Sequence, residues 1–377
     1  MIAWIGDNII SSLGFTTEEN FRAVKSNRSG VCYYPPDMGL QEPYTTSLID
    51  KERLSDSFAP LSSHSEAYTP LEKAAILSVR NAAEQADIDL SDARVLFLFS
   101  STKGNVHLLD EPGFDKKSIY LWHSAQLISA YFENPNTPIV VSNACISGAC
   151  AQIAAMRELE SGAYDYAVVI GVDFLSKFII SGFQSFKALS MEACRPFDKN
   201  RAGLNLGEAA STIIYKRVDD KDNFSGIVLQ QGAVRNDANH ISGPSRTGEG
   251  SFLALQTVLQ TTSVGEIAFV CAHGTATPYN DQMESIALTR AGLNNVPTNS
   301  LKGYFGHTLG AAGVLESIIS THALMNKIVL SSLGFNEGDN EYPLNIAREI
   351  AHTSKPYCVK MLSGFGGCNA ALLFKKI

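Results

Sequence analysis

Short apolar runs alternate with helix-like stretches along most of the chain, and this alternation limits the fold more than any other feature of the sequence. In the first half, the strand-like runs are residues 2–5, 95–99, 139–141, 167–172 and 212–215. Helical periodicity is clearest over residues 71–86 and 146–161. Because strands that alternate with helices are typical of parallel β-α units, the sequence predicts an α/β fold.

The second half of the chain repeats this pattern. Its strand-like runs are residues 227–230, 267–271, 359–362 and 372–374, and its helix-like runs are residues 252–259, 283–291 and 309–325. Between the two halves, the sequence Asp219-Asp-Lys-Asp-Asn-Phe-Ser is charged and typical of a loop. We therefore expect two domains, residues 1–218 and residues 219–377.

Composition and charge exclude several classes of protein. The 377 residues are 45% hydrophobic and 18% charged, which is typical of a compact globular protein. The net charge of −8 argues against nucleic acid as a partner, because phosphate binding needs a basic face. No apolar run reaches the ~18 residues of a membrane span, so we expect a soluble, cytoplasmic protein with no membrane partner. The seven cysteines form no CxxC pair, which favours reduced thiols over a zinc site or a disulfide framework.

Cys145 lies where a predicted strand changes directly into a predicted helix, in Val-Val-Ser-Asn-Ala-Cys-Ile-Ser-Gly-Ala (140–149). At a helix N-terminus, unpaired backbone N–H groups and the helix dipole favour a thiolate. We therefore expect a nucleophile whose pKa is below that of a free thiol. This local pattern also fits a small, buried, apolar cysteine.

Two histidines lie at Gly-rich turns in the second half. Ala-His-Gly-Thr-Ala-Thr-Pro (272–278) places His273 directly after the run 267–271. Lys-Gly-Tyr-Phe-Gly-His-Thr-Leu-Gly-Ala-Ala-Gly (302–313) places His307 just before the helix-like stretch 309–325. Taken alone, either histidine could be a hydrogen-bonded structural residue.

With Cys145 and in this order, the two histidine segments resemble the β-ketoacyl synthase family of the thiolase superfamily. The resemblance extends over nearly the whole chain. It includes Ile-Ile-Ser-Ser-Leu-Gly (9–14), Arg-Pro-Phe-Asp-Lys-Asn-Arg-Ala-Gly (195–203), Leu-Gly-Glu-Ala (206–209) and Gly-Phe-Gly-Gly-Cys-Asn-Ala-Ala-Leu (364–372). It implies a thiolase-like fold of two related halves in a five-layer α-β-α-β-α sandwich, with the active site where the halves meet.

The resemblance also implies an activity. A 3-oxoacyl-acyl-carrier-protein synthase condenses a cysteine-bound acyl group with malonyl-acyl-carrier protein, with loss of CO2, in fatty-acid or polyketide biosynthesis. Such an enzyme uses no metal and no organic cofactor, because its substrates arrive on the phosphopantetheine of acyl-carrier protein. The implied partners are acyl-carrier protein and a second subunit, either identical or homologous. The alternative is a chain-length-setting subunit of a ketosynthase heterodimer, which has little activity of its own and usually lacks the nucleophile.

The catalytic roles follow from the resemblance, position by position. Cys145 would carry the acyl group, and His273 and His307 would donate hydrogen bonds to the malonyl carbonyl. The backbone N–H groups of Cys145 and Phe365 would form the oxyanion hole. Each step needs only groups that these residue types supply.

Four further residues match family positions next to the histidines. Lys302 and Glu284 would form a charged pair that supports them, although Glu284 also fits a structural salt bridge on the helix 283–291. Thr275 and Thr277 match two hydroxyls that bind the pantetheine arm, and they equally fit turn capping.

Other positions bear on the acyl pocket and on assembly. Phe365 matches an aromatic gate that faces the loop starting at Asp237, and it also fits core packing. Ile146 follows the nucleophile where the family usually has a small residue, and we expect it to narrow the acyl channel. Cys368 replaces a usual threonine. The strand 139–141 is expected to pair with its counterpart across a two-fold axis of a dimer.

Overall fold

The structure is a computed structural model that describes residues 1–111, 115–219, 224–237, 239–338 and 341–377. Within these residues, one mixed sheet has ten strands in the order β11-β10-β14-β15-β9-β1-β8-β6-β4-β5. The first half contributes β1 (Ile2–Ser11), β4 (Val95–Ser100), β5 (Ile139–Val141), β6 (Tyr166–Asp173) and β8 (Ala209–Arg217). The second half contributes β9 (Ile227–Asn236), β10 (Ile267–Cys271), β11 (Thr298–Asn299), β14 (Tyr357–Gly364) and β15 (Cys368–Lys376). Every strand-like run predicted from the sequence lies in one of these strands.

The two halves of the sheet have the same pairing pattern. β4 pairs in parallel with β5 and β6, and β10 pairs in parallel with β11 and β14. The pairs β6–β8, β8–β1, β14–β15 and β15–β9 are antiparallel. The prediction of parallel units is therefore right for the outer strands and wrong near the centre. There β14 returns to β15 through a tight turn, which is too short for the crossover that a parallel pair needs.

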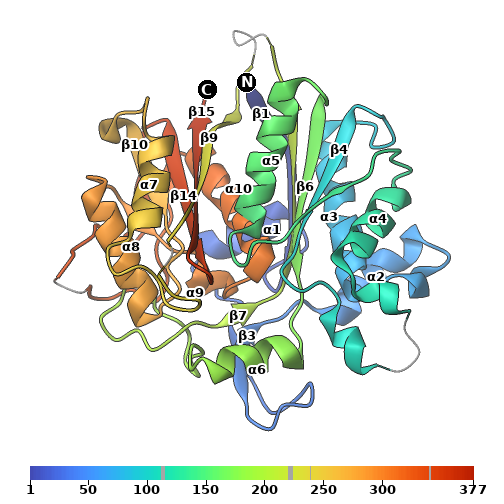
Figure 1. Ribbon diagram of the computed structural model, residues 1–377, viewed down its shortest axis with the longest axis horizontal. Helices are drawn as coiled ribbons and strands as arrows, with labels where there is room; N and C mark the ends of the chain where they lie inside the picture. Colours follow the sequence, from blue (N-terminus) through green and yellow to red (C-terminus); the bar gives the residue numbers. More distant parts are fainter. Residues whose placement is uncertain (112–114, 220–223, 238, 339–340) are drawn as a thin grey trace.

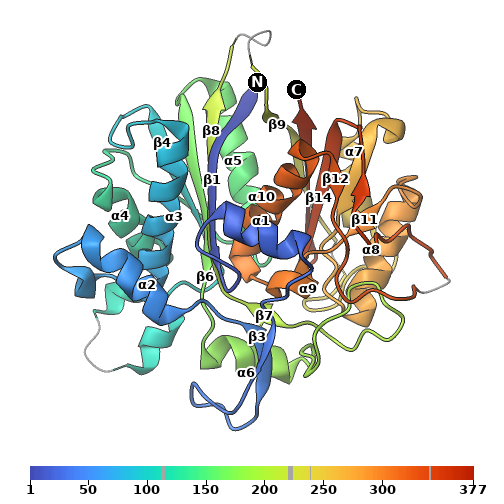
Figure 2. The ribbon, with the colours of Figure 1, turned by 180° about the vertical axis from the view of Figure 1, so that it is seen from behind.

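Helices form three layers around and between the halves (Figure 1). α3 (Pro70–Ala86) covers the first half, and α7 (Glu249–Val258) and α8 (Pro278–Arg290) cover the second. α5 (Ser147–Ser161) and α10 (Ala312–Met325) lie between the halves, and each packs against strands of both. Seen from behind, α10 fills the space between the halves, and α1 (Thr17–Lys25) lies against it (Figure 2). This arrangement is the predicted five-layer α-β-α-β-α sandwich.

The remaining elements are short. The helices are α2 (Lys51–Phe58), α4 (Leu121–Tyr131), α6 (Lys177–Ser185) and α9 (Lys302–Phe305). The small strands are β2 (Cys32–Tyr34), β3 (Tyr44–Ser47), β7 (Leu206–Gly207), β12 (Ile328–Val329) and β13 (Ala351–His352).

Local sequence explains where the long helices begin and end. Thr69 and Glu72 form a capping box at the start of α3, and Pro70 occupies its first turn, where a missing N–H costs nothing. α5 ends at Gly162, which has a left-handed φ of 79° that glycine adopts without strain. The predicted helix 309–325 begins with a short 3-10 turn, Leu309–Ala311, before α10.

Burial follows the layers. One apolar cluster lies between the halves and includes residues of α5 and α10, a second lies under α3, and a third lies under α7 and α8. α10 is buried on nearly all sides because it lies in the middle layer. β5, which the sequence predicts as a buried strand, is only partly buried because it forms an edge of the sheet.

Two expectations concern the chain as a whole. The expected domain boundary at Asp219 adjoins residues 220–223, which lie outside the described residues, so the division into 1–218 and 219–377 stays a prediction. Among the helices of the described ranges, none is both long enough and apolar enough to span a bilayer.

Candidate active site

Cys145, His273 and His307 meet where the two halves join. The cysteine sulfur and one ring nitrogen of each histidine lie within 4.8 Å of one another, and all three residues are buried. The two imidazole rings are 4.9 Å apart between centroids and nearly perpendicular, at 83°. Cys145 lies between β5 and α5, His273 follows β10, and His307 lies between α9 and α10. The structure thus brings together the three residues that the sequence singles out.

The turn at Cys145 has a strained backbone. Ala144 has a positive φ of 45°, which is uncommon for a residue with a side chain. The Ser147 hydroxyl closes the turn, since it donates to the Ala144 carbonyl at 2.6 Å and accepts from the Asn143 N–H at 2.8 Å. Such strain is typical of a functional turn held by its surroundings.

The sequence-based expectation for the Cys145 thiol is wrong. Burial raises its pKa to about 12, and the nearby Cys368 acts in the same direction. Lys302 and the Phe365 N–H, which donates to the sulfur, lower the pKa but do not offset burial. α5 begins at Ser147, two residues after Cys145. Any stabilisation of the thiolate by the helix N-terminus is smaller than the cost of desolvating that charge, so the pKa rises. Cys145 is therefore a protonated thiol at neutral pH.

Both imidazoles are neutral. Burial lowers the pKa of His273 and of His307 well below the ordinary value, and the Lys302 ammonium lowers both further. The His307 Nδ1 accepts from the Leu309 N–H at 3.3 Å, which assigns the ring proton to Nε2. Among the described residues, neither His307 Nε2 nor His273 Nδ1 has a hydrogen-bond partner. Because both histidines line the same cavity, these two unpartnered nitrogens are available to a bound substrate.

The turn between β14 and β15 lies against Cys145. A Cβ on Gly364 would lie 3.1 Å from the Cys145 nitrogen and 2.8 Å from the Cys368 sulfur, so only glycine allows this approach. The turn directs the Phe365 N–H toward the Cys145 sulfur. The two backbone donors that the sequence predicts as an oxyanion hole therefore lie beside the same atom.

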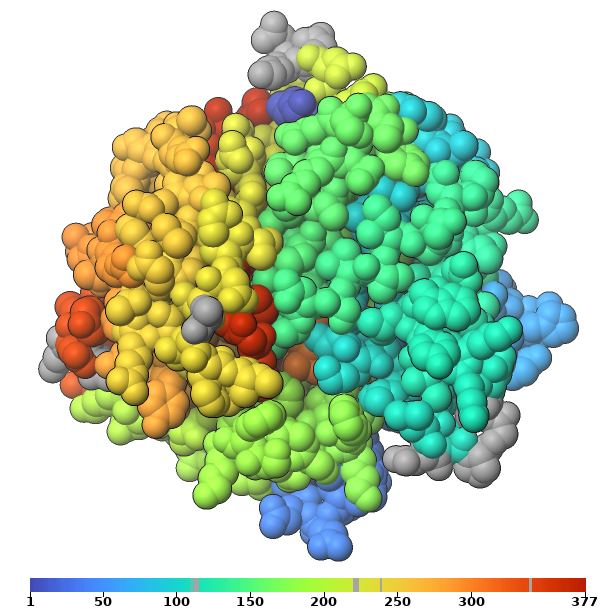
Figure 3. Space-filling view, in the orientation of Figure 1, coloured from blue at the N-terminus to red at the C-terminus, as the bar shows by residue number. Residues whose placement is uncertain are grey.

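A cavity of about 520 Å³ opens onto these residues. Its lining includes Cys145, His273, His307, Thr275, Thr277, Asp237, Phe365, Phe183 and Phe186. Figure 3 shows the surface hollowed between the yellow, light-green and teal segments, with red and orange atoms of the second half inside the hollow. The cavity thus contains every predicted site residue except Lys302 and Glu284.

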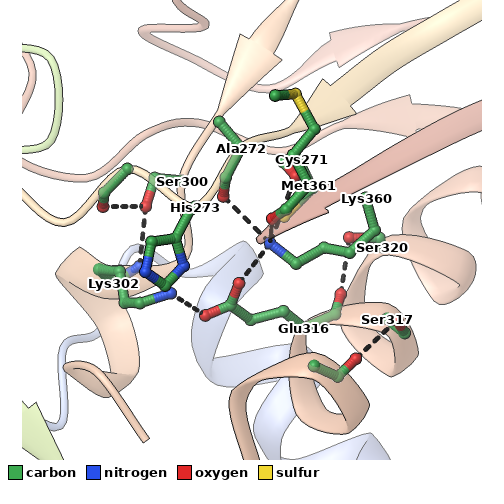
Figure 4. Close-up of polar contacts among 12 residues, drawn as sticks. Cys271, Ala272, His273, Ser300, Lys302, Glu316, Ser317, Ser320, Lys360 and Met361 are labelled. Carbon is green, nitrogen blue, oxygen red and sulfur yellow. Dashed lines mark hydrogen bonds and ion pairs between the residues drawn. The ribbon is translucent and has the colours of Figure 1, made fainter. Parts of the chain in front are cut away.

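The expected charged pair between Lys302 and Glu284 is wrong. Glu284 accepts from the backbone N–H groups of His273 and Gly274, both at 2.7 Å. Lys302 instead forms a buried ion pair with Glu316 of α10 (Figure 4). Burial raises the pKa of Glu284 to about 7, and the nearby Asp281 carboxylate adds to this shift. Glu284 therefore supports His273 through its backbone, and Lys302 acts through a different carboxylate.

Two family models match this chain. Residues 2–221 match the N-terminal domain of beta-ketoacyl synthases, and residues 226–336 match the C-terminal domain. The chain belongs to the beta-ketoacyl synthase family.

Curated relatives of this family member include a 3-oxoacyl-[acyl-carrier-protein] synthase 2 from Vibrio cholerae, 31% identical over 257 residues that cover 63% of this chain and 62% of the relative. A mitochondrial 3-oxoacyl-[acyl-carrier-protein] synthase from Arabidopsis thaliana is 31% identical over 269 residues, which cover 65% and 57% of the two chains. The chain thus spans about three fifths of the length of the curated relatives it matches.

Solved structures establish the thiolase-like fold. A beta-ketoacyl synthase from Burkholderia phymatum has a TM-score of 0.88 at 23% identity, covering 100% of this chain and 99% of that one. A ketosynthase in complex with its chain length factor from Xenorhabdus doucetiae has a TM-score of 0.86 at 24% identity, covering 100% and 98%.

Three buried charged residues of this family member were missed by sequence reasoning. Glu316 and Lys360 lie beside Lys302, and Asp173 accepts from the Gly310 N–H at 2.7 Å in the turn after His307. A signal was present for Lys360 and Glu316, because each is the one Asp, Glu, Lys or Arg in a mainly apolar run, residues 359–362 and 309–325. Charges in such runs are almost always paired, which marks both for attention.

The remaining predicted site residues line the cavity in different ways. The hydroxyls of Thr275 and Thr277 hydrogen-bond to each other at 2.9 Å, and the Thr277 side chain does not cap α8. Asp237 is tied into the structure, since it accepts from the Gly250 N–H at 2.5 Å and from the Asn369 amide at 3.0 Å.

Phe365 projects its ring away from the core. It is 37% exposed, stacks on Phe183 at 5.7 Å and meets Phe186 edge-on at 5.4 Å. These three rings form an aromatic cluster in the cavity lining. A gating role for Phe365 and the loop at Asp237 stays a prediction.

Ile146 does not border this cavity. It is fully buried in the apolar cluster between the halves and is absent from the described lining. The expectation that it narrows the acyl channel is therefore not met here, because its side chain points into the core beneath the nucleophile.

Proposed function

We propose that this chain is a 3-oxoacyl-acyl-carrier-protein synthase that joins a Cys145-bound acyl group to malonyl-acyl-carrier protein with loss of CO2. The observation that carries the proposal is the convergence of one thiol and two neutral imidazoles in a single cavity. Membership of the beta-ketoacyl synthase family and the names of the relatives support it. The proposed steps use the chain's own residues and no cofactor.

The first half-reaction transfers the acyl group. The Cys145 sulfur bonds to the thioester carbon, the bond from that carbon to the pantetheine sulfur breaks, and the Cys145 proton passes to the departing sulfur. Because burial raises the pKa of Cys145 to about 12, a neighbouring neutral imidazole must take the proton as the sulfur attacks. Backbone N–H groups of Cys145 and Phe365 hold the oxyanion, and each such donor is worth about 3 kcal/mol in the transition state.

The second half-reaction forms the carbon–carbon bond. His273 and His307 donate hydrogen bonds to the malonyl thioester carbonyl, so the bond to CO2 breaks and its electron pair forms an enolate. The enolate carbon attacks the acyl carbonyl on Cys145, the carbon–sulfur bond breaks, and the released Cys145 thiolate takes up a proton from solvent to return to the thiol. The unpartnered Nε2 of His307 fits this role, because it is a buried donor free to bind an oxyanion.

The cavity lining fits a substrate on a long flexible arm. Thr275 and Thr277 offer hydroxyls for the pantetheine amides, and Phe365 with the loop at Asp237 forms the gate. The implied partner is acyl-carrier protein. The seven cysteines are free thiols, which supports a reducing cytoplasmic compartment.

A second candidate function is that of a chain-length-setting subunit with little activity. One similar structure is a ketosynthase bound to its chain length factor. This similarity is the reason to consider the second candidate function. The intact constellation of Cys145, His273 and His307 favours the active enzyme. Incubation with an acyl-carrier-protein thioester followed by peptide mass spectrometry decides between them: we expect an acyl group on Cys145, and an unmodified Cys145 would favour the silent subunit.

Two features of the surface support a proposal about assembly. β5 is a partly exposed edge strand, and Tyr120 and Trp122, near the start of α4, are exposed and stacked on each other. We propose that β5 pairs with β5 of a second subunit, identical or homologous, and that these rings are covered in the dimer. Light scattering on the isolated chain tests the identical case, in which we expect a dimer.

A further inference from the structure

Lys360 is a buried cation that no step of the proposed mechanism uses. It lies on β14, where its neighbours Val359 and Met361 are apolar and buried, and its side chain is fully inaccessible. A lone ammonium in such a place costs several kcal/mol unless charges and hydrogen bonds compensate it. Its partners therefore show what it does.

Those partners are all in the polar network behind His273 (Figure 4). The Lys360 Nζ lies 2.5 Å from Glu316 Oε2, while the other oxygen of that carboxylate pairs with Lys302. The same ammonium donates to the carbonyls of Ala272 at 3.1 Å and Met361 at 2.8 Å, with Cys271 at 3.3 Å. Lys360 thus links the end of β10 to the carboxylate that holds Lys302.

The Ala272–His273 peptide unit is held from both sides. Its carbonyl accepts from Lys360, and its N–H donates to Glu284. A peptide plane fixed at both polar ends cannot rotate without breaking a charge-assisted hydrogen bond. Because this plane leads directly into His273, it sets the direction from which the imidazole enters the cavity.

We propose that Lys360 is a positioning residue for His273, holding the Ala272–His273 peptide opposite Glu284 and joining it to Lys302 through Glu316. This inference rests on the proposed function for its kinetic readout. The network places the ammonium groups of Lys302 and Lys360 behind the histidines, and the positive charge of each lowers the pKa of both imidazoles. That charge acts to keep the imidazoles neutral and able to donate.

The charged and titratable groups around Lys360 come from every element packed against it. They are Cys271 of β10, Glu316 of α10, Lys302 of α9, Glu284 of α8, and His273 and His307. Since the Lys360 cation lowers the pKa of both histidines, its removal raises those pKa values. The acid limb of the pH profile must then move to higher pH.

The test uses the full chain with Lys360→Met, which keeps the length of the side chain and removes its charge. We expect malonyl decarboxylation to fall about 10- to 100-fold, the range for a displaced catalytic group, while iodoacetamide labelling of Cys145 stays near the wild-type rate. In histidine-labelled protein, NMR should show His273 and His307 titrating at higher pH. Lys375→Met, which removes a partly exposed cation from neighbouring β15, is the control and should change neither readout.

Lys360→Arg separates charge from position. It keeps the cation, so the histidine titration should return toward that of the wild type, while decarboxylation stays reduced because a planar guanidinium cannot reproduce the contacts. This variant also decides the question if Lys360→Met does not fold. Wild-type decarboxylation and histidine titration in a folded Lys360 variant would overturn the proposal.

Failure of the proposed function would give a different result. If the wild-type chain does not decarboxylate a malonyl thioester, the proposed function fails. The histidine titration alone then still decides the role of Lys360.

Discussion

The two helices of the middle layer, α5 and α10, occupy equivalent places in the two halves but bury different chemistry. α5 buries Gln152, whose amide donates to the Gly313 carbonyl at 2.9 Å and accepts from the Tyr215 hydroxyl at 2.8 Å. α10 buries Glu316 between Lys302 and Lys360. A neutral amide satisfies its hydrogen bonds at little cost, whereas a buried charge cluster is costly to desolvate. The comparison teaches that the second half keeps charge where the histidines need it, while the first half needs only a rigid support for Cys145.

The largest effect should come from removing one of the two histidines that the second half brings to Cys145 of the first half. His273→Ala and His307→Ala each remove a donor for the malonyl carbonyl, so we expect decarboxylation to fall by at least ~100- to 1000-fold. Acylation of Cys145 should survive in part, because backbone N–H groups hold its oxyanion and the remaining imidazole can still take the Cys145 proton. Single-turnover acylation and CO2 release measure the two steps. Complete loss of acylation in both folded variants would contradict the assignment of the two imidazoles chiefly to the malonyl carbonyl.

The next effect compares the two buried side chains directly. Glu316→Gln leaves two buried ammonium groups without their central carboxylate and should lower the free energy of unfolding by about 3–5 kcal/mol. Gln152→Leu leaves the Tyr215 hydroxyl without an acceptor and should cost about 1–3 kcal/mol. Denaturant unfolding of both variants gives the two values. Equal decreases in the free energy of unfolding would mean that the charged cluster around Glu316 depends no more on its central side chain than the neutral network around Gln152 does.

The pH dependence of the alkylation rate of Cys145 tests whether burial raises the pKa of this thiol. The thiolate is the reactive form, and burial raises the pKa of Cys145 to about 12, so its alkylation rate should still rise about tenfold per pH unit near pH 10. A free thiol levels off above about pH 8.5. Iodoacetamide labelling followed by mass spectrometry, with N-acetylcysteine as the reference, measures the profile. A plateau of the alkylation rate below pH 9 would contradict the raised pKa and support the lowered pKa that the sequence predicts.

The smallest effect concerns Ile146, beneath the nucleophile. Ile146→Val removes one methyl group from the central core and should cost about 0.5–1.5 kcal/mol of stability. The preference among acyl chains of different length should not change, because Ile146 does not line the cavity. Relative kcat/KM values across short, medium and long acyl substrates check this. A changed preference would show that the acyl chain reaches past Cys145 into the core.

Sequence periodicity was sufficient to predict the strands and helices that form the layers of this fold. Residues 267–271 and 146–161 were predicted as strand and helix, and β10 and α5 match them closely. Cys145, His273 and His307 were also found from sequence, because the motifs around them together resemble those of the β-ketoacyl synthase family. The antiparallel centre was missed, since the direction of β15 depends on a turn of three residues and not on periodicity.

Partners across the core could not be predicted in the same way. Lys302 meets Glu316 and not Glu284 because α10 passes behind the histidines while α8 presents Glu284 to backbone N–H groups. That choice depends on how the helices pack, which no spacing in the sequence records. The raised pKa of Cys145 was missed for a related reason: the helix N-terminus is visible in the sequence, but the depth of burial is not.

The turn between β14 and β15 gives one residue two tasks. The Phe365 N–H points at the Cys145 sulfur, and its ring lies in the aromatic cluster that lines the cavity. Gly366 and Gly367 follow with φ of 84° and 75°, so the turn has backbone freedom on one side of Phe365. A ring that swings to admit an acyl chain must therefore shift the donor that polarises it. The backbone position of one residue therefore couples the shape of the cavity lining to the hydrogen bond at the nucleophile.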